Sequence, residues 1–123
     1  MSRARYEPFP DPGSPTPVGI EVAVPPHHQG LIAHVDDLRQ RARAQHVWVA
    51  LWTTAEAHAL YSPVAVELLT PDGAAWPCGH LSEADSPGWR RLLQLRFQHG
   101  VRWMWPAMII APDPDTWRLV FYH

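Results

Sequence analysis

The chain has 123 residues, 46% of them hydrophobic, and a formal net charge of −2. One domain of this length buries roughly two-thirds of its unfolded surface, which is enough core to fold without disulfides or metals. The near-neutral charge leaves no basic footprint for nucleic acid or anionic lipid, the single cysteine excludes an internal disulfide, and no apolar run approaches the ~20 residues that span a bilayer.

Lysine and asparagine are absent, which is typical of a high-GC bacterial genome. The N-terminus carries arginines but no apolar segment of the kind that follows them in a secretory signal. We therefore expect a cytoplasmic bacterial protein that binds neither nucleic acid nor membrane.

Residues 1–19 contain five of the fourteen prolines, together with Gly13, Ser14 and Thr16. Such a composition disfavours both helices and strand ladders and is typical of a mobile or polyproline-like leader. We predict a disordered proline-rich tail over residues 1–19 and a single domain over residues 20–123.

The ordered part begins with period-2 alternation over residues 18–24, which predicts a half-buried strand. Leu31, Val35, Leu38 and Ala42 then recur at helical spacing, opposite a charged face, and predict a helix over about residues 28–45.

The middle of the chain predicts three further strands. Residues 47–52 are apolar on both faces, as in a central strand, and residues 64–69 form the next strand. The sequence Thr70-Pro71-Asp72-Gly73 is a strong turn, because proline presets φ and glycine accepts a positive φ. It should close a hairpin that returns through residues 74–76.

A second helix is predicted over residues 87–99, with Ser86 as its N-cap, Pro87 in its first turn and Gly100 as its stop. Its predicted buried stripe consists of Trp89, Leu92, Leu93 and Phe97.

Two strands, residues 103–111 and 117–122, end the chain, and Pro106 indicates a sheet edge or a bulge in the first of them. The predicted order is β-α-β-β-β-α-β-β. We expect an α+β fold: a single mixed, mostly antiparallel sheet of about six strands, with two helices on one face.

Eight histidines and Cys78 raise the question of a metal or catalytic site. Cys78 and His80 would supply a thiolate and an imidazole, and His58 or His80 would serve Cys78 as a base. Zinc signatures pair ligands at both ends of the motif, whereas one end alone is present here. We predict no metal, no cofactor and no catalytic residue. The alternative is a small enzyme, or a ligand- or metal-binding protein, that uses the His58/Cys78/His80 region.

Seven tryptophans are the most unusual feature of the composition. Trp103 and Trp105 share one face of their predicted strand, and Pro106 beside them weakens strand pairing. We expect both indoles to be exposed near Arg102 and Arg118, a composition that protein interfaces enrich. A stacking platform for single-stranded nucleic acid normally adds a basic groove, which the net charge argues against. The predicted partner-binding residues are Trp103, Trp105, Arg102, Arg118 and Tyr122.

The C-terminal half has a recognisable outline. Its pieces are a strand containing Trp48, the turn Pro71-Asp72-Gly73, the helix end Leu92-Leu93-Gln94-Leu95-Arg96, the link Gly100-Val101-Arg102-Trp103, and a final hairpin closing on Phe121-Tyr122-His123. Over residues 46–123 this outline resembles small immunity proteins of bacterial polymorphic and contact-dependent toxin systems. The usual second glycine before the tryptophan is absent and His123 replaces the terminal acid, so the resemblance implies a functional class and no contact residues.

We therefore expect a non-catalytic protein-binding module, most simply an immunity or antitoxin-type protein that neutralises a partner toxin encoded by a neighbouring gene. Such a protein needs a rigid complementary face and no catalytic residues. Homo-oligomers that associate through an edge strand stay open as a further possibility.

Overall fold

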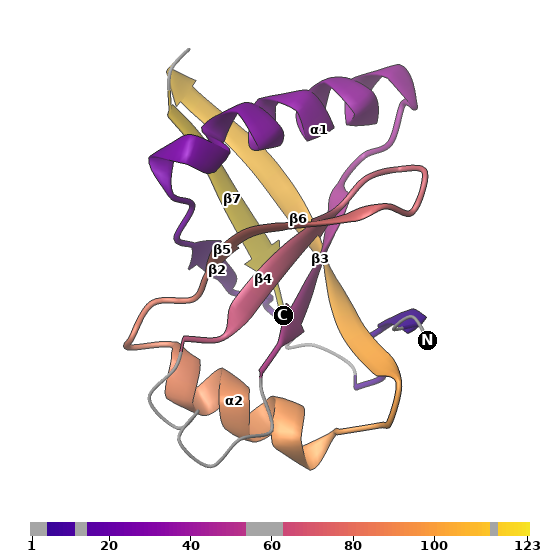
Figure 1. Cartoon of the computed structure of the whole chain (residues 1–123), viewed down its shortest axis with the longest axis vertical. Helices are drawn as coiled ribbons and strands as arrows, with labels where there is room; N and C mark the ends of the chain where they lie inside the picture. Colours follow the sequence, from indigo (N-terminus) through magenta and orange to yellow (C-terminus); the bar gives the residue numbers. More distant parts are fainter. Residues whose placement is uncertain (1–4, 12–14, 54–62, 114–115) are drawn as a thin grey trace.

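The computed structural model describes residues 5–11, 15–53, 63–113 and 116–123, which form seven strands and two α-helices (Figure 1). The strands are β1 (Arg5–Pro8), β2 (Gly19–Val22), β3 (Val47–Trp52), β4 (Ala65–Leu69), β5 (Ala75–His80), β6 (Val101–Asp113) and β7 (Thr116–Tyr122). The helices are α1 (Gln29–Arg41), preceded by the 3₁₀ turn Pro26–His28, and α2 (Ser86–Leu95). The predicted α+β class with a mostly antiparallel sheet is confirmed.

The sheet is strongly curled, and its strand order is β2-β7-β6-β3-β4-β5, with antiparallel pairing between neighbours. β6 is the longest strand at 13 residues. One edge of β6 pairs with β3, and the other pairs with β7 and, further toward its start, with β1 in parallel. β6 therefore pairs with the N-terminal strand as well as with two strands of the main sheet.

The inner face of this curled sheet holds the hydrophobic core. Alternate residues of the strands point inward, among them Val49 of β3 and Phe121 of β7, both fully buried. Ile32 and Val35 of α1 and Leu93 of α2 join the same cluster. The two helices lie across opposite ends of the sheet (Figure 1). Because residues of both helices belong to the core cluster, both helices cover the inner side of the sheet.

Part of the N-terminal segment forms a strand, in contrast to the disordered tail predicted over residues 1–19. Residues Arg5–Pro8 pair in parallel with the start of β6, and Phe9 packs against the core. Phe9 stacks on Trp105 with ring centroids 4.8 Å apart, and Asp11 accepts two hydrogen bonds from Arg96, at 2.7 and 2.5 Å. The edge of β6 that β7 leaves unpaired, together with an aromatic pocket, outweighs the low strand propensity of proline.

Element boundaries depart from the predicted ones where side chains have tertiary partners. Ser86 is not the N-cap of α2: its hydroxyl is buried, accepts a hydrogen bond from Val64 N at 3.1 Å and donates one to Leu81 O. α2 ends at Leu95, so Phe97 falls beyond the helix and is 72% exposed instead of completing the buried stripe. Pro106 lies inside the sheet, between the end of the β1 pairing at Met104 and the start of the β7 pairing.

Candidate functional site

Alternation along β6 separates the predicted partner-binding residues into two groups. Trp103 and Trp105 share one face, as predicted, but it is the inner face, and they are only 8% and 2% exposed. The expectation that these two indoles are exposed is therefore wrong. Arg102 lies on the opposite face of β6, which we call the outer face of the sheet.

Both buried indoles have polar partners, which explains how the core accommodates them. Trp103 Nε1 donates to Arg96 O at 2.9 Å, just beyond the end of α2. Trp105 Nε1 donates to His123 Nδ1 at 3.2 Å, and its ring meets Trp89 edge-to-face with centroids 5.4 Å apart. A buried indole N–H without an acceptor would cost about 1–3 kcal/mol, so these bonds make an inward orientation favourable.

The outer face of β3, β6 and β7 carries a different set of apolar side chains. Register places Pro106 opposite Trp48 and Ile110 opposite Arg118, and the alternate residues of β6 point the same way. Met108, Ile110 and Tyr122 are 42%, 38% and 36% exposed. Within the part of the chain that the structure describes, α1 and α2 pack on the inner face, so these side chains lack a helical cover.

Two hollows lie on either side of a ridge formed by Trp48 and Met104. The larger, of about 510 Å³, is bounded by Leu69 and the turn that follows β4. The smaller, of about 250 Å³, lies toward Pro106 and Tyr122, where the N-terminal segment forms its far wall. Their walls are mostly apolar, so the outer face offers a raised ridge with a recess on each side.

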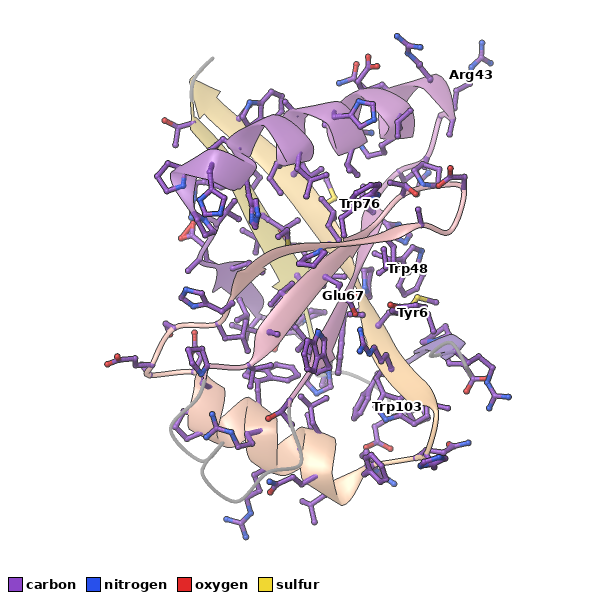
Figure 2. The ribbon with its side chains drawn as sticks, viewed as in Figure 1. Tyr6, Arg43, Trp48, Glu67, Trp76 and Trp103 are labelled. Atoms are coloured by element: carbon purple, nitrogen blue, oxygen red, sulfur yellow. The ribbon has the colours of Figure 1, made fainter. Side chains whose placement is uncertain are left out.

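A polar cluster borders this ridge toward the start of β6. Glu67 of β4 is only 7% exposed, and it accepts hydrogen bonds from Tyr6 Oη, 3.2 Å from each carboxylate oxygen. Arg102 forms an ion pair with the same carboxylate, and its guanidinium lies 4.6 Å from the centroid of the Trp52 ring. Tyr6, from the N-terminal strand, thus reaches Glu67 across the outer face (Figure 2).

The electrostatics of this cluster follow from burial and from Glu67. Burial, and then the neighbouring carboxylate, raise the pKa of Tyr6 above its ordinary value of 10.0. The charges of Glu67 and Arg102 compensate each other, and Arg102 can stack on Trp52 without carrying an unpaired charge.

A second ion pair, between Arg118 and Glu21, lies on the outer face. Arg118, one of the predicted partner-binding residues, donates to Glu21 on β2, and that hydrogen bond is the main cause of its raised pKa. Of the five predicted partner-binding residues, the structure therefore places Arg102, Arg118 and Tyr122 on the outer face.

The alternative site at His58, Cys78 and His80 is not assembled within the described residues, because His58 lies outside them. Cys78 is fully buried, its thiol donates to Val66 O at 3.5 Å, and burial followed by Glu67 raises its pKa to about 12. His80 Nδ1 lies 3.0 Å from Leu81 O. A thiol with this pKa is almost entirely protonated near neutral pH, which disfavours Cys78 as a nucleophile.

Among the described residues, no cluster of three or more histidine, cysteine, aspartate or glutamate side chains has the arrangement that holds a metal ion. None of the described helices is long and apolar enough to cross a membrane. Comparison with protein-family models, curated proteins and solved structures finds no match to this chain.

Three outer-face residues were missed at the level of the sequence: Trp48, Met108 and Ile110. Trp48 lines both hollows and lies outside the core cluster. The useful signal was the period of β6, because Met104, Met108 and Ile110 alternate with the buried tryptophans and share the opposite face.

Proposed function

We propose that this chain is a non-catalytic protein-binding module that docks a partner protein on the outer face of β3, β6 and β7. The observation that carries the proposal is the exposed apolar set Met108, Ile110 and Tyr122 beside a ridge with two recesses. Contiguous apolar surface of this kind marks interaction sites in soluble proteins, and tryptophan and tyrosine are enriched among the residues that dominate binding.

We further propose that the partner is a toxin and that the chain acts as its immunity protein. The support is the resemblance in outline over residues 46–123, together with a site whose geometry is suited to occlusion and not to chemistry. Cys78 lies in the core and burial raises its pKa to about 12, so the thiol stays protonated, which disfavours the alternative of a small enzyme that uses it.

The test is to mix the purified chain with the toxin candidate encoded by the neighbouring gene and to measure both complex formation and toxin activity. We expect a 1:1 complex by size-exclusion chromatography and loss of toxin activity. Trp48→Ala should weaken binding by about thirtyfold or more, because it removes the ridge between the recesses. The matched control is Trp76→Ala, a 51% exposed tryptophan on β5, which should bind like the wild type.

Two outcomes contradict the proposal. If the mixture forms no complex and the toxin keeps its full activity, the proposed immunity function is contradicted. Equal binding by wild type and Trp48→Ala, with both variants folded, removes the outer face as the docking site.

A further inference from the structure

The charged side chains of the outer face pair with one another, as expected of a surface that binds an uncharged partner surface. The pairs are Glu67 with Arg102 and Glu21 with Arg118. A strongly basic or acidic partner would therefore gain little from long-range attraction, because opposite charges already lie side by side. The occupant that this pattern favours presents an equally neutral, apolar surface.

A second copy of this chain presents such a surface. Two copies with a formal net charge of −2 each repel one another only weakly. Each brings one ridge, Trp48 with Met104, and the adjoining recesses of about 510 and 250 Å³. A two-fold axis through the face sets the ridge of each copy against a recess of the other, which is the self-complementary arrangement of an isologous dimer.

The face is also large enough for a dimer. β6 has 13 residues and spans roughly 43 Å at ~3.3 Å per residue, and the three strands of the face, β3, β6 and β7, are spaced ~4.8 Å apart. The product is on the order of 600 Å², which is the lower end of the area that each partner buries in a stable interface.

We propose that two copies of this chain pair through their outer faces in a two-fold dimer, and that this dimer masks the face until another protein displaces it. The displacement step rests on the proposed function, whereas the dimer does not. The dimer buries Met108, Ile110 and Tyr122, the exposed apolar side chains of the face.

Sedimentation velocity over a concentration series up to about 100 µM tests the dimer. We expect the wild type to approach twice the chain mass of 14.0 kDa. Ile110→Glu should raise the dissociation constant by about tenfold or more, because it places two charges in a neutral apolar interface. Met108→Ser removes an apolar side chain without adding charge and should weaken the dimer less.

The matched control is Leu95→Glu, the same kind of change at an apolar residue of α2 that is 74% exposed and lies off the face. It should dimerise like the wild type. A wild type that stays monomeric at about 100 µM overturns the proposal, as does a dimer that Ile110→Glu and Leu95→Glu affect equally. Circular dichroism on each variant confirms that a loss of dimer is not a loss of fold.

Adding the toxin candidate separates this inference from the proposed function. A dimer that gives way to a 1:1 complex supports both. A monomeric chain that still binds the toxin overturns the dimer alone. A dimer that binds no toxin overturns the proposed function and the displacement step, and a complex that retains an intact dimer overturns the masking.

Discussion

Ala23 and His80 exchange two backbone hydrogen bonds, from Ala23 N to His80 O at 2.8 Å and from His80 N to Ala23 O at 3.2 Å. This pair joins the end of β2 to the end of β5, the outermost strands of the sheet order, so the curled sheet meets itself at one point. Meeting in this way covers part of two edges that would otherwise offer unpaired N–H and C=O groups to another chain.

Gly79→Ala should disrupt this contact. A Cβ at position 79 would lie 2.1 Å from Ala23 O, a backbone atom that cannot move without breaking the pair. We expect the free energy of unfolding to fall by about 2–4 kcal/mol, as measured by urea denaturation. The control is Gly88→Ala in α2, where a Cβ meets nothing within 4 Å. It should stabilise the chain by about 0.5–1 kcal/mol, and a neutral Gly79→Ala would contradict the closure.

Gln29 completes the edge of β7 where β2 no longer reaches it. Its side-chain amide donates to Trp117 O at 3.1 Å and accepts from Trp117 N at 2.7 Å, so it stands in for the backbone of a neighbouring strand. Gln29→Ala removes both bonds and should cost about 1–2 kcal/mol in thermal or urea unfolding. Gln45→Ala, at an exposed glutamine, should change stability by less than about 0.5 kcal/mol. Equal effects of the two changes would show that the Gln29 bonds contribute nothing.

Tyr6 should make the stability of the chain sensitive to alkaline pH. Burial and Glu67 raise its pKa in the folded state above 10.0, so the folded chain holds the phenolic proton more tightly than the unfolded chain does. This contribution is fully present below the unfolded pKa and is lost as the pH rises through the folded pKa. Above pH 10 the wild type should therefore lose stability relative to Tyr6→Phe, as measured by urea denaturation at a series of pH values. Parallel curves for the two proteins would contradict this assignment.

The order of the helices and strands from α1 onward follows from local patterns in the sequence. The period of α1 and the continuous apolar run of β3 are set by which side chains must be buried, and such patterns can be read over a few residues. Gly73, with a φ of 91°, confirms the predicted turn between β4 and β5.

The features that the sequence did not predict depend on distant contacts. β1 forms because β7 leaves part of the β6 edge open and because Phe9 finds Trp105, 96 residues away in the chain. Alternation correctly placed Trp103 and Trp105 on a common face, but which face is buried depends on where α1 and α2 pack. We therefore predicted the tryptophan face of β6 to be exposed, whereas the exposed face is the opposite one, which carries Arg102 and adjoins Arg118 and Tyr122 of β7.

Cys78 should be chemically inert in the folded chain. Its side chain is fully buried and its pKa is raised to about 12, so at pH 8 roughly one thiol in ten thousand is the reactive thiolate. A disulfide reagent such as dithionitrobenzoate should leave the native protein unmodified over hours and titrate one thiol at once in guanidinium. Gly79→Ala provides a sensitive comparison, because opening the sheet next to Cys78 should accelerate the reaction. Rapid labelling of the native wild type would return Cys78, with His80, to consideration as a reactive centre.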